Sequence, residues 1–127
     1  MLAVAGKGDI DPALLTKLAG GFCSGMARTS GMCGAVTGGI LAINLLLGRE
    51  DLSDSIEGNY SAVQKLIERF ENRFQSANCT ELLQCDLGTE EGQKKFREEE
   101  LFNRCREFTS EAARITAEIL ESIEKKG

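Results

Sequence analysis

The cysteines are the residues of this chain best placed to carry out chemistry. The chain has no histidine, which removes the commonest general base and metal ligand and every Cys–His or Ser–His pair. What remains is thiol chemistry: exchange with disulfides, or thiolate binding of a soft metal or an iron–sulfur cluster. The five cysteines are Cys23, Cys33, Cys79, Cys85 and Cys105.

The spacing of the cysteines excludes two common thiol motifs. No pair has the Cys-x-x-Cys spacing, so the thioredoxin-type redox motif and the zinc ribbon are both absent. Any thiol site must therefore be assembled by the fold, from cysteines that are not joined by a short motif.

Cys33 and Cys79 are expected at the beginnings of helices, each after a loop of glycine or small polar residues. A helix N-terminus carries partial positive charge and unpaired N–H groups, which lower the pKa of a thiol. Gly31 and Gly34 would leave the Cys33 sulfur open to approach. The pattern predicts reactive thiolates at both cysteines. Cys23, in a glycine-rich turn, is better explained as a small packing residue.

The elements that must position these thiols are helices throughout. Asp11-Pro12 is a helix start, Gly20-Gly21 a stop, and residues 20–31 are expected to form a flexible turn. The apolar periodicity then predicts further helices, and no convincing strand. The predicted helices cover residues 12–19, 32–47, 57–75, 79–83, 89–99 and 101–125.

The helix over residues 32–47 is apolar nearly all round, which is typical of the centre of a fold. Gly34 and Gly38 lie four residues apart and form a smooth strip that another backbone can approach. We therefore predict an all-α fold, a single-domain helical bundle of about five to six helices around this glycine-containing helix. Residues 1–10 are expected to form a poorly defined N-terminal segment.

Composition limits the function classes. A chain of 127 residues with 42% hydrophobic and 28% charged residues is typical of one globular domain. The net charge of -5, with no basic face, argues against a nucleic-acid partner. The longest apolar stretch, residues 35–47, is too short for a membrane-spanning helix of about 20 residues. No secretory signal is evident, so we expect a cytoplasmic protein whose cysteines are free, metal-bound or redox-active.

Three segments resemble one known family. Cys33–Gly38 reads CGAVTG and resembles the CGAxxG motif of the putative redox-active proteins named C_GCAxxG_C_C. Residues 21–28 are similar to that family's GFGGGMGR stretch, and residues 78–87 to its NCRELLGxDL segment. Cys105 is similar to the last cysteine of the family. The resemblance implies a redox role, with Cys33, Cys79 and Cys105 as the candidate catalytic thiols.

One departure from the family pattern lies at the beginning of the chain. Family members usually carry another cysteine upstream of the glycine-rich stretch, and residues 1–10 contain none. Either the start is truncated relative to the family or this branch has lost that cysteine. A four-thiolate site for an iron–sulfur cluster or zinc would then use Cys33, Cys79 and Cys105, with Cys85 or Cys23 as the fourth ligand. The candidate cofactor-binding glycines are Gly31, Gly34 and Gly38.

Two classes of function follow. In the first, the chain is a cysteine-based redox protein that exchanges disulfides with a partner protein, or holds a cluster or soft metal. In the second, it is a structural or interaction module, such as a homodimer joined through the strip at Gly34 and Gly38, with inert buried cysteines. No residue pattern identifies a substrate or assigns an enzymatic reaction.

Overall fold

The computed structural model describes residues 10–126, with side chains as far as residue 124. The expected N-terminal segment over residues 1–10 lies, apart from Ile10, outside the described residues. The described chain is all-α, as predicted, and contains no strand. Its elements are α2 (Pro12–Ala19), the 3-10 turn η1 (Gly20–Phe22), α3 (Cys23–Arg28), α4 (Gly34–Leu47), α5 (Glu57–Phe74), α6 (Cys79–Leu83), α7 (Glu90–Glu98) and α8 (Phe102–Lys126).

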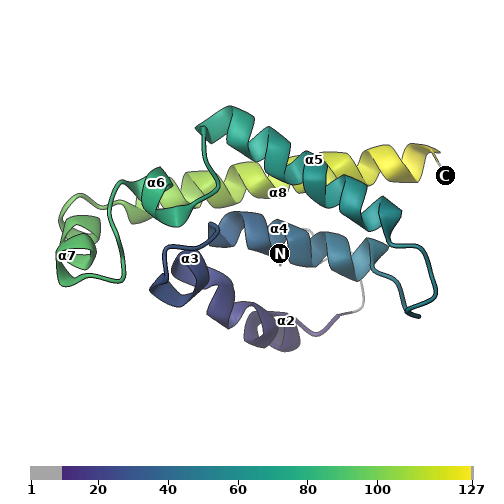
Figure 1. The fold of residues 1–127 in the computed structure, drawn as a ribbon, viewed down its shortest axis with the longest axis horizontal. Coiled ribbons are helices and arrows are strands. Elements are labelled where there is room, and N and C mark those ends of the chain that lie inside the picture. Colours follow the sequence, from purple (N-terminus) through teal and green to yellow (C-terminus); the bar gives the residue numbers. More distant parts are fainter. Residues whose placement is uncertain (1–9, 127) are drawn as a thin grey trace.

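Helices α4, α5 and α8 pack against one another and enclose the core (Figure 1). Three phenylalanines form an aromatic cluster where α5 meets α8. The ring centroids of Phe74 lie 4.9 Å from those of both Phe70 and Phe108, in the tilted and edge-on geometries that aromatic pairs favour. Burial of apolar side chains from all three helices, among them Val36, Leu66 and Ile115, is the main force that holds the helices together.

Helix α4 has the central position that its sequence predicts, but solvent reaches its C-terminal end. Leu45 and Leu46 are 40% and 50% exposed. Helices α5 and α8 thus cover only part of the surface of α4. None of the described helices has the length and apolarity that crossing a membrane requires.

Gly39 allows α4 to approach its two neighbours closely. A Cβ atom at this position would lie 2.7 Å from Leu66 Cδ2 on α5 and 2.7 Å from Thr116 Oγ1 on α8. Leu66 and Thr116 are both fully buried. The missing side chain therefore sets the separation of the three core helices. The close packing that it allows outweighs the low helix propensity of glycine at this position.

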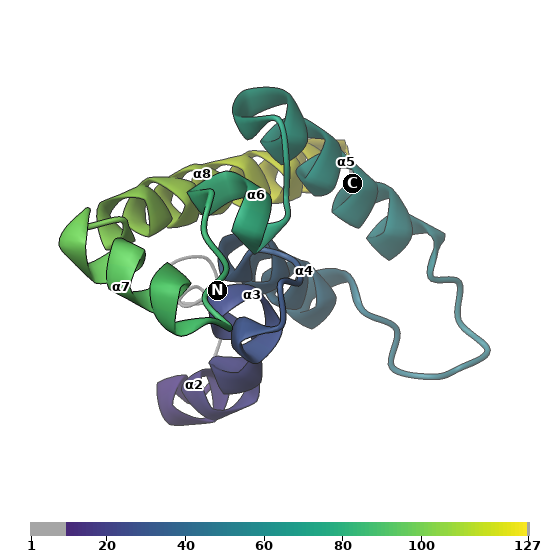
Figure 2. The ribbon, with the colours of Figure 1, turned by 60° about the vertical axis from the view of Figure 1, so that its left-hand side comes forward.

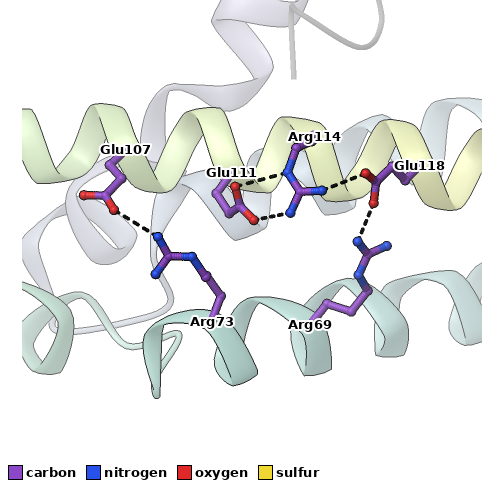
Figure 3. Close-up of polar contacts among 6 residues, drawn as sticks. All are labelled: Arg69, Arg73, Glu107, Glu111, Arg114 and Glu118. Atoms are coloured by element: carbon purple, nitrogen blue, oxygen red, sulfur yellow. Dashed lines mark hydrogen bonds and ion pairs between the residues drawn. The ribbon is translucent and has the colours of Figure 1, made fainter.

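Ion pairs line the outer side of the contact between α5 and α8 (Figure 3). Arg69 pairs with Glu118, which also accepts from Arg114 at 2.7 Å, and Arg114 pairs with Glu111. Hydrogen bonds from these arginines hold the pKa values of Glu111 and Glu118 below their usual range. Because the pairs are exposed, each stabilises the fold only slightly.

The helix boundaries follow local signals that the sequence carries. Asp11, Asn78 and Thr89 each cap a helix with a side-chain oxygen, which accepts from Ala13 N at 3.0 Å, Glu81 N at 3.1 Å and Gly92 N at 2.9 Å respectively. Helix α4 begins two residues later than predicted. Met32 belongs instead to an isolated β-bridge with Asn78.

Candidate thiol site

An antiparallel bridge holds Cys33 and Cys79 near each other. Around the pair Met32 and Asn78, Cys33 N donates to Ala77 O at 2.7 Å and Cys79 N donates to Gly31 O at 3.0 Å. Alternate residues of an extended strand share a face, and directly opposite residues of an antiparallel pair do so too. Cys33 and Cys79 therefore lie on the same side of the bridge, as diagonal neighbours.

The same bridge brings two helix beginnings together. Cys33 is the N-cap of α4, and Cys79 is the first residue of α6. Asn78 fixes the arrangement with both ends of its side chain: Nδ2 donates to Ser30 O at 2.7 Å, while Oδ1 caps α6. A hydroxyl–hydroxyl bond of 2.6 Å joins Ser30 to Thr80. The loop before α4 is thus tied to the start of α6.

The segment before this loop is a left-handed helical turn, where a flexible turn was expected. All residues from Ser24 to Arg28 have positive φ, and four of them are not glycine. Each such residue costs about 1–2 kcal/mol relative to the right-handed form. Backbone strain of this kind is typical of functional sites, where surrounding contacts must hold it in place. Figure 2 shows α3 beside α6 and the beginning of α4.

The backbone of the left-handed turn packs closely against Cys79. A Cβ atom on Gly25 would lie 2.5 Å from Cys79 Cβ and 3.1 Å from Cys79 Sγ. Gly25 O also accepts from Thr29 N at 3.2 Å and Gly31 N at 2.9 Å, which closes the turn. Glycine is required here both for its positive φ and for the space that Cys79 occupies.

The cysteines converge on one cavity of about 670 Å³ between α2, α3, α4, α6 and α8. Cys33 and Cys79 are buried, Cys105 is half-buried, and Cys23 is exposed. The fifth cysteine, Cys85, is buried but does not line the cavity. The lining thiols are Cys23, Cys33, Cys79 and Cys105.

The three candidate glycines lie at or beside this cavity. Gly34 and Gly38 line it, and a Cβ atom on Gly34 would lie 3.3 Å from the backbone of Cys23. Gly31 packs against Met26 and supplies the carbonyl that accepts from Cys79 N. At Gly34 the smooth strip on α4 is thus approached by another backbone, and that backbone belongs to the same chain.

The thiols are less acidic than helix N-termini alone would make them. Burial raises the pKa of Cys33, although the backbone N–H groups of Ala35 and Val36 act in the opposite direction. Burial, followed by the charges of the neighbouring cysteines and Asp86, raises the pKa of Cys79 from 9.0 to about 11. The prediction of lowered pKa values is therefore wrong, because desolvation outweighs the helix N-terminus.

Burial also raises the pKa of the other two candidate cysteines. At Cys105, the nearby thiols of Cys33 and Cys85 raise it further. At Cys85, the charge of Lys95 lowers the pKa, but by less than burial raises it. All four candidate thiols are thus protonated at neutral pH until a base accepts the proton or a bound cation displaces it.

The described residues contain no group of three or more Cys, Asp or Glu side chains placed to hold a metal ion. Two-electron thiol chemistry needs only two cysteines, and the bridge brings Cys33 and Cys79 to the same side of one cavity.

Two features of the site were missed from the sequence. The sequence favours a packing role for Cys23, yet Cys23 lines the cavity with the candidate thiols. Gly25 carried no separate prediction, although it lies against Cys79. The glycine-rich stretch around both residues was the available signal, since glycines there predict unusual backbone and close approach.

Comparisons with known proteins agree with the resemblance in the sequence. The profile of a family described as "Putative redox-active protein (C_GCAxxG_C_C)" matches residues 1–119. Neither a search of curated proteins nor a search of solved structures found a match.

Proposed function

This chain belongs to the C_GCAxxG_C_C family of putative redox-active proteins, and from that premise we propose that it works by reversible thiol–disulfide exchange. The observation that supports this best is the placement of Cys33 and Cys79 on one side of a β-bridge. Both thiols face a cavity that Cys105 also lines. The proposed partner is a disulfide-carrying molecule or protein, in a reducing compartment such as the cytoplasm.

We assign Cys33 as the attacking thiol. The backbone N–H groups of Ala35 and Val36 oppose the rise that burial causes in the pKa of Cys33, and no backbone donor opposes it at Cys79. Cys33 attacks one sulfur of the incoming disulfide and expels the other as a thiol. Cys79 then attacks the Cys33 sulfur and expels the second thiol. Two protein thiols are oxidised to one disulfide, and one external disulfide is reduced to two thiols.

Closing the bond between Cys33 and Cys79 requires a local movement. Diagonal neighbours across an antiparallel pair have Cβ atoms roughly 7 Å apart, whereas a disulfide needs about 3.5–4.5 Å. Gly31 and Gly34 on either side of the bridge allow the backbone to move at low cost. Cys105 is an alternative resolving thiol, since it lines the same cavity.

Thiolate binding of an iron–sulfur cluster or a soft metal such as zinc is the second candidate. One observation favours it: neighbouring cysteines raise the pKa values of both Cys79 and Cys105. A bound cation would offset this mutual repulsion and displace the protons. Its proposed ligands are Cys33, Cys79, Cys85 and Cys105. It ranks below disulfide exchange because no three ligating side chains gather among the described residues.

An interaction module with inert cysteines has less support. The strip on α4 was the proposed surface for a second copy of the chain. The backbone of Cys23 already lies against Gly34. Close approach at this end of the strip is thus made within one chain.

The test is a thiol count on chains equilibrated with mixtures of reduced and oxidised dithiothreitol. We expect two thiols per chain to disappear in one transition, and to return on reduction. Cys33→Ala should abolish this transition, and so should Cys79→Ala combined with Cys105→Ala. The matched control is Cys85→Ala, because Cys85 is equally buried but does not line the cavity. A thiol count that never changes would contradict disulfide exchange.

Metal analysis of protein purified without oxygen separates the two candidates. Disulfide exchange predicts a colourless protein free of stoichiometric iron and zinc. Bound iron with visible absorption, lost equally in Cys33→Ala and Cys85→Ala, would favour the cluster instead.

A further inference from the structure

The cavity that contains the thiols has no charged side chain among the described residues that line it. Its wall is made of aliphatic, aromatic and small residues, such as Leu15, Leu41, Leu83 and Phe96. Its volume of about 670 Å³ lies within the roughly 300–1,000 Å³ of sites for small organic ligands. Size and wall chemistry together describe a small-molecule site.

The residues that line the cavity differ in their exposure to solvent. Among the exposed lining residues are Cys23, Ser24 and Thr109, which we call the mouth. Cys33 and Cys79 are buried, and we call them the floor. A ligand that reaches the floor must leave water behind, and any charge it carries there would have no partner.

We propose that the cavity selects uncharged, apolar organic disulfides as substrates for Cys33 and Cys79, and excludes charged ones. The inference rests on the proposed function and names its substrate class. Burying an unpaired charge costs several kcal/mol, and each 1.4 kcal/mol corresponds to a tenfold change in rate or affinity. Selection of at least about tenfold against a charged disulfide follows.

Two chromogenic disulfides of similar shape provide the test. 4,4′-Dithiodipyridine is uncharged near neutral pH, whereas 5,5′-dithiobis(2-nitrobenzoate) carries two carboxylates. Each is offered to the reduced full chain, and labelled cysteines are identified by mass spectrometry. The rate ratio of the two probes at each folded cysteine is divided by the ratio at the same cysteine in urea-unfolded chain. Measurements in high salt remove the general repulsion from the net charge of -5.

We expect the uncharged probe to be favoured at least tenfold at Cys33 and Cys79. At the exposed Cys23 the corrected ratio should stay near one, which makes this thiol an internal control. A lysine in the cavity wall would pair with a carboxylate of 5,5′-dithiobis(2-nitrobenzoate) and so allow this probe to enter. Ala113→Lys, on the half-buried face of α8, should therefore reduce the preference, whereas the uncharged control Ala113→Met should not.

Equal corrected ratios at the floor and at Cys23 would overturn the inference, and so would a floor that neither probe labels. Neither result decides whether the chain exchanges disulfides, which the thiol count tests separately. The reaction products distinguish the substrate class from disulfide exchange. Release of two thiopyridones without retained label indicates an intrachain disulfide. A stable mixed disulfide at Cys33, formed selectively from the uncharged probe, supports the substrate class but contradicts disulfide exchange within the chain.

Discussion

Replacing Gly25 with alanine tests whether the left-handed turn is built around Cys79. Alanine at positive φ costs about 1–2 kcal/mol. Its Cβ atom would begin 2.5 Å from Cys79 Cβ. Ordinary carbon contacts are about 3.5–4.0 Å, so the turn or α6 must move by roughly 1 Å. Overpacking of this kind costs about 1–3 kcal/mol. The expected total is a loss of about 2–5 kcal/mol in the free energy of unfolding.

Urea unfolding followed by circular dichroism measures this loss. With a urea dependence of about 1–3 kcal/mol per molar, the midpoint should fall by roughly 1–3 M. Gly21→Ala is the matched control from the same glycine-rich stretch. Its Cβ atom would meet nothing within 4 Å, so we expect little change.

The origin of the loss can be separated by a double-mutant cycle. Cys79→Gly removes the Cβ atom that the new alanine would strike. Combined with Gly25→Ala, it should recover the overpacking part, about 1–3 kcal/mol, and leave the cost of positive φ. If Gly25→Ala and Gly21→Ala destabilise the fold equally, the left-handed turn is not packed against Cys79 and the description of the site is wrong.

Three further predictions concern packing, thiol ionisation and acid stability. Gly39→Ala should lower the free energy of unfolding by about 1–3 kcal/mol, since its methyl group would overlap two buried side chains. Gly58→Ala, on an open surface of α5, should be neutral or slightly stabilising. The iodoacetamide reaction rate of Cys79 in the folded chain should keep rising to about pH 11, beyond the pH at which it levels off in unfolded chain; coincident profiles would contradict its burial. Because the folded pKa is raised, the protonated thiol stabilises the fold below pH 9.0, and this contribution is lost as pH rises towards about 11. The pKa values of Glu111 and Glu118 are lowered, so their ion pairs stabilise the fold above the unfolded-state pKa and weaken as pH falls through the folded one. Acid melting of a Glu111→Gln, Glu118→Gln double variant should therefore depend less on pH than that of the unmodified chain.

Local signals made much of the fold predictable from sequence. The caps at Asp11, Asn78 and Thr89 depend on side chains that bond to backbone groups two or three residues away. Such contacts need no knowledge of the rest of the chain. The apolar periodicity of α5 and α8 likewise identifies the buried faces before any packing is known.

Features that depend on distant contacts were not predictable in the same way. The turn before Gly31 becomes left-handed where Gly25 packs against Cys79, more than fifty residues along the chain. The helix N-terminus at Cys33 was anticipated, but its burial was not, and burial decides the direction of the pKa shift. The convergence of Cys23 with the other thiols depends on the path of α2 and α3, which short-range patterns do not specify.

The linkage of cysteines in the oxidised chain tests the central claim most directly. Protein equilibrated with oxidised dithiothreitol is alkylated, digested without reductant and mapped by peptide mass spectrometry. We predict an intrachain disulfide between Cys33 and Cys79, reversed by reduced dithiothreitol, with Cys85 recovered as free thiol. Recovery of Cys33, Cys79 and Cys105 all as free thiols, at every ratio of oxidant to reductant, would contradict a redox role based on disulfide exchange.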